Sequence, residues 1–256
     1  MAWTAGSRAP DLTERVTATV RPDGLPILRQ TWEDALFLHW RVPMEWLKHR
    51  VPAPLRIDTF QGSAWVGIVM FAVRDSHPAF TPRFAWIRDF HEVNVRTYVH
   101  LDGVPGVWFF SLDADSPVAV TTARTFFRLP YFESGMLHNV EGQRIHMRSS
   151  RISSGVPASI TATWTPGPEE LVAPPGSLEF FWVERYNLFT ADSNTLYRTR
   201  VHHDPWPLRE VPIANYDTTL LHSNGFPLTE TRDRAHLLAG GPVESEIWPL
   251  EALGTF

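Results

Sequence analysis

EVNVRTYVHL, the stretch from Glu92 to Leu101, carries the strongest structural signal in the sequence. Side chains of two kinds alternate along it: Val93, Val95, Thr97 and Val99 on one side, Glu92, Asn94, Arg96 and Tyr98 on the other. Alternation with a period of two is typical of a β-strand with one apolar and one polar face. The polar face either meets solvent or lines a small barrel, where its groups would converge on a ligand. The pattern alone leaves both alternatives open.

Further strand-like runs lie on both sides of this stretch. They are residues 35–42 (ALFLHWRV), 64–73 (AWVGIVMFAV), 107–112 (VWFFSL), 143–150, 158–164, 195–201 and 243–248. The run 64–73 is apolar throughout, which predicts a strand buried on both faces. Asp102-Gly103 begins the connection to 107–112 and predicts a hairpin with a loop longer than two residues. Residues 76–82 are expected to form a loop.

Short helices are expected between these strands. Pro43 precedes one at 44–50, Ser116-Pro117 begins one that reaches about residue 127, and Ser177 caps one at 178–185. Residues 1–25 are expected to be a loosely attached arm or a short helix. About eight short strands with turn signals between them predict a mainly β (α+β) fold, an antiparallel barrel or sandwich with a few peripheral helices, in a single domain spanning residues 1–256.

The composition narrows the classes of function. Hydrophobic residues make up 43% of the chain and the net charge is −5, without a run of like charges. We therefore expect neither a nucleic acid nor a membrane as partner. The start of the chain lacks the apolar core of a signal peptide, so a cytoplasmic location is expected. Cysteine is absent, and no phosphate-binding loop, dinucleotide fingerprint or serine elbow occurs, so no cofactor is expected.

Lysine is almost missing from the sequence. Lys48 is the only lysine among 23 basic residues. Because an imine with a carbonyl substrate requires a lysine amine, Lys48 is the one candidate for that chemistry.

Two further groups of polar residues are candidate sites. Arg124, with Arg128 and Tyr131 beyond it, could clamp a carboxylate, or it could be a surface arginine near a helix C-terminus. The second group is Glu184, Arg185 and Tyr186, followed by His202 and His203. Neighbouring residues on a strand point to opposite faces, so the two histidines do not share an ion easily. No metal is expected, and a hydrogen-bond network is the favoured use.

Several motifs resemble those of acetoacetate decarboxylases and, more closely, of the YqjF-like branch of that superfamily, a domain of unknown function. The residues 46–58 read WLKHRVPAPLRID, and 90–131 contain FHEVNV, VWFFSLDAD and ARTFFRLPYF. QTWEDALFLHW, SLEFFWVERYNLF and HHDPWPL match the YqjF-like branch. Together the motifs cover most of residues 30–208. The resemblance implies an acetoacetate-decarboxylase-like fold, a cone-shaped, largely antiparallel β-barrel that closes on a cavity.

The resemblance also changes how the polar residues are interpreted. Glu92 matches a cavity glutamate of the decarboxylases, so Asn94 and Arg96, of the same strand parity, would also face inward. The decarboxylases carry two adjacent lysines where this chain reads FFRL at 126–129. Their second cavity glutamate falls near 66–67 and is missing here. Their cavity arginine falls near Glu33, with Arg29 close enough in sequence to replace it.

The sequence therefore predicts a cavity for a small anionic organic ligand. Glu92 is the candidate catalytic acid or base, and the candidate ligand-binding residues are Asn94, Arg96, Tyr98, Arg124 and Tyr131. A non-catalytic binding module is the alternative, and imine chemistry through Lys48 is the least favoured one. Whether the chain forms a homo-oligomer is left open.

Overall fold

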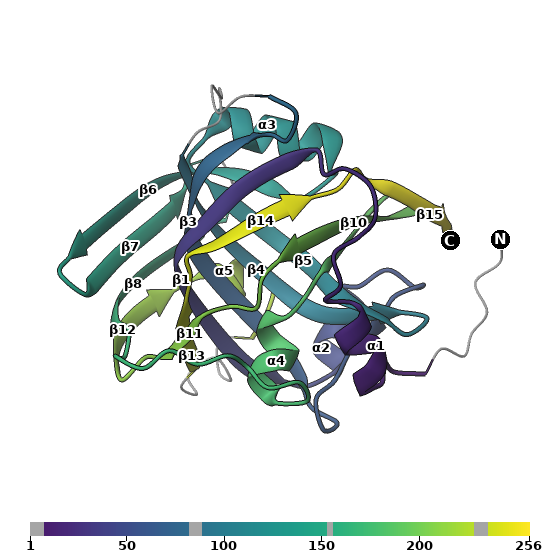
Figure 1. Cartoon of the computed structure of the whole chain (residues 1–256), viewed down its shortest axis with the longest axis horizontal. Helices are drawn as coiled ribbons and strands as arrows, with labels where there is room; N and C mark the ends of the chain where they lie inside the picture. Colours follow the sequence, from purple (N-terminus) through teal and green to yellow (C-terminus); the bar gives the residue numbers. More distant parts are fainter. Residues whose placement is uncertain (1–7, 82–88, 153–155, 228–234) are drawn as a thin grey trace.

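A closed barrel forms the centre of the molecule in the computed structural model, which describes residues 8–81, 89–152, 156–227 and 235–256 (Figure 1). Its strands follow the order β5-β9-β10-β14-β1-β3-β4, and β4 pairs with β5 to close the ring. Only β5 and β9 run parallel within the ring. The strands are β1 (Leu28–Val42), β3 (Ala64–Pro78), β4 (Phe90–Leu101), β5 (Val104–Ala114), β9 (Asn187–Asp192), β10 (Thr195–His203) and β14 (Val243–Ile247). The expected mainly β, largely antiparallel barrel is confirmed.

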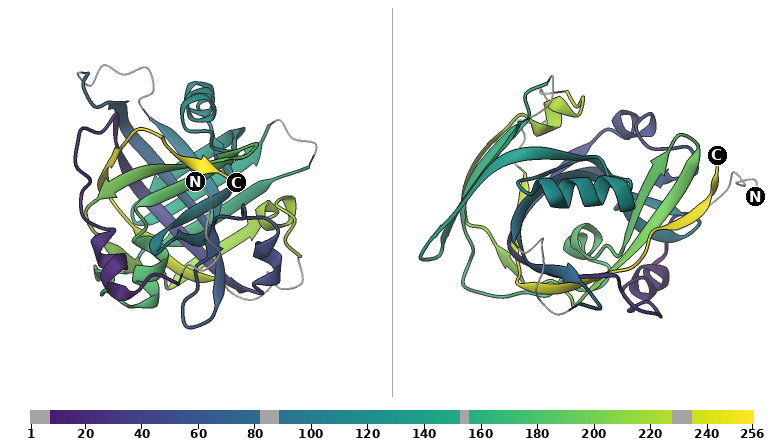
Figure 2. Two further views of the ribbon diagram at one scale, coloured as in Figure 1. Left: turned by 90° about the vertical axis from the view of Figure 1, so that its right-hand side faces the viewer. Right: turned by 90° about the horizontal axis from the view of Figure 1, so that it is seen from above.

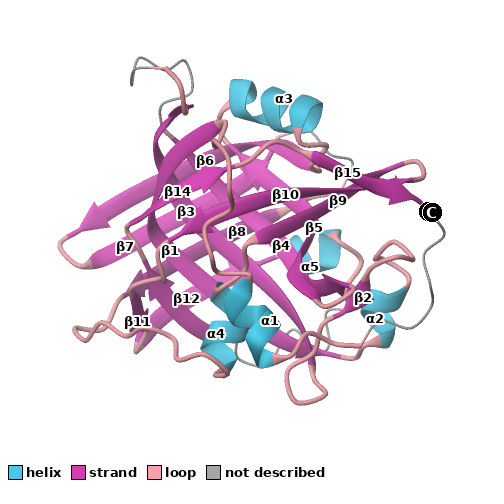
Figure 3. Ribbon diagram, turned by 45° about the vertical axis from the view of Figure 1, so that its right-hand side comes forward, coloured by secondary structure: helices cyan, strands magenta, loops and turns pink. Residues whose placement is uncertain are grey.

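Beyond the barrel, the sheet continues through the pairing of β6 with β5 into a second layer that covers part of the barrel's outer surface (Figure 3). It consists of β6 (Tyr131–Glu141), β7 (Arg144–Arg151), β8 (Ser159–Thr165) and β12 (Ile213–Thr218). Apolar side chains of β1, β3 and β4 that point away from the barrel axis share one core with β7 and β8. This second layer explains why residues 64–73 are buried throughout, as their apolar composition predicted.

The alternation in β4 separates two interiors. Val93 and Val95 pack into the core between the barrel and the second layer. Glu92, Asn94 and Arg96, on the other face, line the inside of the barrel. The polar face of this strand is therefore enclosed, as the resemblance implied.

Helices close the two ends of the barrel. In Figure 2, α3 (Pro117–Phe126) crosses one opening, and α4 (Leu178–Val183) lies inside the ring toward the other end. The Ser116 and Ser177 side chains cap them by accepting from the backbone N–H of Ala119 and Phe180, as expected. Four consecutive residues of α4 are buried, so this helix fills the barrel end.

The remaining elements extend the edges of the sheet. β2 pairs with β4, β13 with β1 and β11, and β15 with β10. Their bounds are α1 (Leu12–Thr17), α2 (Glu45–Lys48), β2 (Arg56–Ile57), β11 (Leu208–Glu210), α5 (Leu220–Ser223), β13 (His236–Gly240) and β15 (Glu251–Thr255). None of the helices in the described part of the chain is long and apolar enough to cross a membrane.

Two expectations about local structure require correction, and a third is decided between its alternatives. The hairpin loop has only two residues, because Asp102 and Gly103 both adopt positive φ, 46° and 83°, which suits the tight turn between twisted strands. The loop expected at 76–82 begins later, since β3 continues to Pro78. Of the two alternatives for residues 1–25, the described part contains the short helix α1, and it is fastened: both guanidinium Nη atoms of Arg15 donate to the buried carboxylate of Asp58, at 2.7 and 2.6 Å.

Candidate functional site

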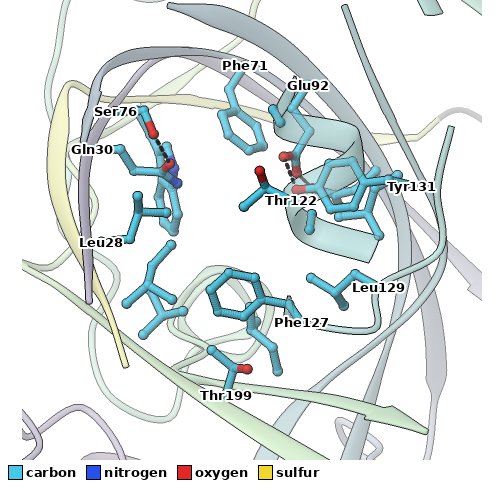
Figure 4. A pocket seen from close by; sticks show the side chains of 18 of the residues that line it. Leu28, Gln30, Phe71, Ser76, Glu92, Thr122, Phe127, Leu129, Tyr131 and Thr199 are labelled. Atoms are coloured by element: carbon cyan, nitrogen blue, oxygen red, sulfur yellow. Dashed lines mark hydrogen bonds between the residues drawn. The ribbon is translucent and has the colours of Figure 1, made fainter. Parts of the chain in front are cut away.

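A cavity of about 830 Å³ occupies the barrel between α3 and α4 (Figure 4). Most of the side chains that line it are aromatic or aliphatic, and a few polar groups project among them. Figure 4 shows two hydrogen-bonded pairs on opposite walls, Glu92 with Tyr131 and Gln30 with Ser76. Mostly apolar cavities of this size with few polar groups are typical of small-molecule sites.

Glu92 is fixed by two donors. Its Oε2 accepts from the Tyr131 hydroxyl at 2.5 Å, and its Oε1 accepts from Asn94 Nδ2 at 3.1 Å. Burial disfavours the ionised form and raises the pKa of Glu92 from 4.5 to about 7, although these two hydrogen bonds and the charge of Arg96 act in the opposite direction. At neutral pH the carboxyl group can therefore either donate or accept a proton.

Arg96 differs from the other interior arginines that line or flank the barrel. Arg185 donates to Asp58 at 2.7 Å, and Arg151 donates to both oxygens of Asp113 at 2.6 and 2.8 Å. Arg96 donates from Nη2 to the carbonyl of Trp182 at 3.1 Å, and its buried Nε has no partner among the described residues. Arg96 therefore brings a positive charge into the cavity. In the described residues, no carboxylate lies within salt-bridge distance of it.

Other buried polar atoms in the cavity lining also lack partners. Within the described ranges, Asn94 Oδ1 and Trp32 Nε1 form no hydrogen bond. The great majority of buried polar groups in proteins are hydrogen-bonded, so each exception requires an explanation, such as an ordered water or a functional role. Together with Arg96, these atoms place unsatisfied hydrogen-bonding groups at this part of the wall.

A β-bulge shapes the wall beside Arg96. The register of β4 and β5 shifts between Val95 and Arg96, so that Arg96 lies opposite Phe109. Phe109 and Leu112 consequently both line the cavity, while Phe110 packs into the outer core. Bulges commonly redirect side chains next to functional sites.

His203 lines the cavity, although the sequence predicted only a hydrogen-bond network for its group. Its Nδ1 donates to the carbonyl of Asp204 at 2.7 Å, which leaves the lone pair on Nε2. The ring stacks on Tyr186, with centroids 4.6 Å apart. Burial lowers the pKa of His203 to about 4, so the imidazole is neutral at pH 7. Strand parity was the available signal, since Thr199 and Val201 of the same strand also line the cavity.

Two expected ligand-binding residues do not line the cavity. Tyr98 lies one pleat beyond Arg96, where Phe181 of α4 fills the barrel, and its hydroxyl lies 2.6 Å from His39 Nε2. Arg124 is exposed, and its Nε donates to the backbone carbonyl of Tyr131 at 2.7 Å. The helix face that meets the cavity carries residues 118, 119, 122, 123, 126 and 127, which excludes position 124. Glu92, Asn94, Arg96 and Tyr131 are brought together.

The other basic candidates lie elsewhere. Arg29 points away from the cavity and pairs with Glu246 at 3.0 Å, so it does not replace the decarboxylases' arginine. Lys48 lies on α2, half exposed, and pairs with Glu45 at 3.2 Å. Neither residue lines the cavity.

Glu184 and Tyr186 share a hydrogen-bond network of the kind that the sequence favoured for this group. Glu184 accepts from the backbone N–H of Trp206 at 3.0 Å and from the Tyr186 hydroxyl. His202 and His203 point to opposite faces of β10, and only His203 reaches the cavity. Among the residues that the structure describes, no cluster of three or more His, Asp or Glu could hold a metal ion.

The comparisons with known proteins agree with this architecture. Residues 29–242 match the model of the DUF2071 family, described as an uncharacterized conserved protein. The chain belongs to this family. It is 38% identical to the protein YqjF of Bacillus subtilis (strain 168) over 229 residues. This matched region makes up 90% of this chain and 93% of that protein.

Solved structures with the same fold include decarboxylases. Acetoacetate decarboxylase from Legionella pneumophila is similar with a TM-score of 0.63 at 13% identity, over 99% of both chains. The enduracididine biosynthesis enzyme MppR, complexed with pyruvate, has a TM-score of 0.62 at 11% identity, over 91% of this chain and 92% of its own. These similarities confirm the expected acetoacetate-decarboxylase-like fold, and fold alone does not carry function.

The segment 126–129, where the resemblance implied the decarboxylases' lysine pair, contributes apolar surface. Phe126, Phe127 and Leu129 line the cavity, and Figure 4 shows the Phe127 ring pointing into it. Arg128 turns away and pairs with Asp192. Among the residues that the structure describes, no lysine lines this wall.

Proposed function

We propose that this DUF2071 protein binds a small organic anion in its barrel cavity and transfers protons on that ligand with Glu92, without a lysine. One observation carries the proposal: the cavity-lining guanidinium of Arg96 faces no carboxylate at salt-bridge distance among the described residues, in a mainly apolar cavity that also holds a carboxyl group with a pKa of about 7. Such groups gather at functional sites more often than elsewhere.

The charge of Arg96 favours an anionic ligand. A planar guanidinium offers paired donors that match the two oxygens of a carboxylate. Away from bulk water, this pairing is stronger than on the surface. Pyruvate, the ligand named for MppR, is a carboxylate bound by a protein of the same fold. That precedent supports the class of ligand only.

Glu92 suits proton transfer on such a ligand. A base works best when its pKa lies close to the working pH. On a keto acid, ionised Glu92 would take a proton from the carbon next to the carbonyl. The electron pair of the broken C–H bond would form a C=C bond, and the carbonyl electrons would move to oxygen, where Arg96 stabilises the negative charge. Return of the proton from Glu92 completes the cycle.

An imine route has no support from the geometry. Lys48 is outside the cavity and paired with Glu45. A Schiff base requires the amine to reach the ligand carbonyl.

Proton exchange tests the catalytic part. Pyruvate and its higher homologues are incubated with the protein in D₂O, and NMR follows loss of the hydrogens next to the carbonyl. Glu92→Gln should lower the exchange rate at least about 100-fold and leave ligand affinity within a few-fold. An unchanged rate in Glu92→Gln would show that Glu92 is not the base.

A non-catalytic binding module is the second candidate. The two hydrogen bonds that fix Glu92 are also what a structural carboxyl group would have. Carboxylates that bind through Arg96, with no proton exchange above the uncatalysed rate in the unaltered protein, would favour the module.

A further inference from the structure

We infer that the ligand is an amphipathic organic acid, with its carboxylate at Arg96 and an apolar tail that extends toward α3. This inference rests on the proposed function and names the ligand class of the same site. It follows from three features of the cavity: where its charge lies, what lines the remainder, and what surrounds its mouth.

Arg96 lies at the end of the cavity that α4 closes. Its Nη2 donates to the carbonyl of Trp182 in α4, and in the β3–β4 pairing it lies opposite Gly67. Phe90, which also lines the cavity, lies opposite Val73 near the other end of β4. The two positions are six residues apart along β4, which corresponds to roughly 20 Å of strand at about 3.3 Å per residue. A ligand held by Arg96 therefore has a long path to α3.

The walls along this path are mainly apolar. Val69, Phe71, Leu112, Leu188 and Val201 are among the side chains that line it. The Ser76 hydroxyl donates to Gln30 Oε1 at 3.4 Å, so this polar pair on the wall is matched internally. Such a surface gains free energy when it covers an apolar tail.

Exposed apolar side chains surround the mouth. Phe80, Val118 and Phe126 line the cavity and are nevertheless 77%, 49% and 66% exposed. Exposed apolar side chains that gather in one place commonly mark a binding site. An acid with only three or four carbon atoms, bound at Arg96, would leave these side chains and most of the 830 Å³ without contact.

A homologous series of straight-chain acids tests the inference. Butanoate, octanoate and dodecanoate are titrated into the protein by calorimetry. Affinity should rise about two- to four-fold for each added methylene, as expected for burial of one CH₂ group. Octan-1-ol, which has the tail without the charge, should bind at least about tenfold more weakly than octanoate. Arg96→Met should remove this preference for the acid.

A matched pair of variants on α3 locates the tail. Thr122 points into the cavity (Figure 4), whereas Thr121, on the same helix, is exposed and does not line it. Thr122→Trp should weaken dodecanoate binding at least about tenfold, because the indole fills the space that the tail needs. Butanoate affinity should change by less than about threefold. Thr121→Trp should leave both affinities unchanged.

The outcomes separate the inference from the proposed function. If butanoate and dodecanoate bind equally well, and both depend on Arg96, the amphipathic ligand is wrong while the anion site stands. If no carboxylate binds, or if Arg96→Met binds all of them as well as the unaltered protein, the proposed function is wrong. If octan-1-ol matches octanoate, the cavity is an apolar site and the carboxylate head is wrong.

Discussion

Glu92 and His203 face the same cavity, and burial shifts their pKa values in opposite directions, to about 7 and to about 4. A carboxyl group is driven toward its protonated form and an imidazole toward its unprotonated form, because both are then neutral. The positive charge of Arg96 lowers both pKa values and so opposes the first shift and adds to the second. The cavity thus favours neutral forms of Glu92 and His203 beside the charge of Arg96.

Substituting Glu92 should change how stability depends on pH. Its pKa is about 7 in the folded chain and ordinarily 4.5, so between these values the folded state holds more protons than the unfolded state. Stability is then lost as the pH rises from 4.5 to 7, by up to about 3 kcal/mol from this group. The free energy of unfolding of Glu92→Gln, taken relative to that of the unaltered protein, should therefore be higher at pH 8 than at pH 5. Urea unfolding at both pH values measures this, and a constant difference would contradict it.

Substituting His203 should have the opposite effect. Its pKa falls from 6.5 to about 4 on folding, so the unfolded state holds more protons in this window. Stability is then lost as the pH falls from 6.5 to 4. The amide of His203→Asn can still donate to Asp204. Its free energy of unfolding should fall below that of the unaltered protein by the smallest amount near pH 4.5 and by the largest amount at pH 7.5. Parallel curves for variant and parent in urea unfolding would show that His203 is not buried in its neutral form.

A buried ion pair holds the helix α1 to the barrel. The carboxylate of Asp58 lies between Arg15 of α1 and Arg185 at the end of α4. Asp58→Asn would leave two largely buried guanidinium groups without their counter-charge and should cost about 3–5 kcal/mol of unfolding free energy. Arg21→Met, which removes a more exposed pair with Glu246, is the control and should cost less than about 1 kcal/mol. Equal losses in thermal or urea unfolding would contradict this role of Asp58.

Period-two patterning predicted the main elements and half of the site. The alternation in β4 placed Glu92, Asn94 and Arg96 on one face, and the structure encloses that face. Where a bulge interrupts a strand, the pattern fails: Asp34 adopts φ 52° within β1, so Trp32 and Phe37 both line the cavity despite their opposite parity. Such a shift depends on tertiary pairing and leaves little trace in the sequence.

Residues contributed by distant strands were harder to predict. β6, at 131–141, was not expected. Only one of its residues is buried, so its sequence shows little alternation between apolar and polar side chains. His203 enters the cavity only because β10 joins the barrel through β14 and β9. Arg124 was misplaced because the sequence indicated a helix without showing which face meets the barrel.

At the scale of the whole molecule, the barrel keeps its one lysine away from its cavity. Treatment with pyruvate and borohydride should leave Lys48 without a reduced adduct, because its amine is on α2 and paired with Glu45. Mass spectrometry of the peptide that contains Lys48 checks this. A stoichiometric adduct there, formed more slowly when the cavity is filled with octanoate, would restore the imine route.

The most direct test is a crystal structure of the protein with the carboxylic acid that raises its melting temperature most. We expect the carboxylate within about 2.7–2.9 Å of the Arg96 guanidinium nitrogens, the distance of a charge-assisted hydrogen bond, with Glu92 still bonded to Tyr131 and the tail directed toward α3. A carboxylate bound outside the barrel, or a guanidinium of Arg96 paired with Glu92 instead of the ligand, would contradict the anion site.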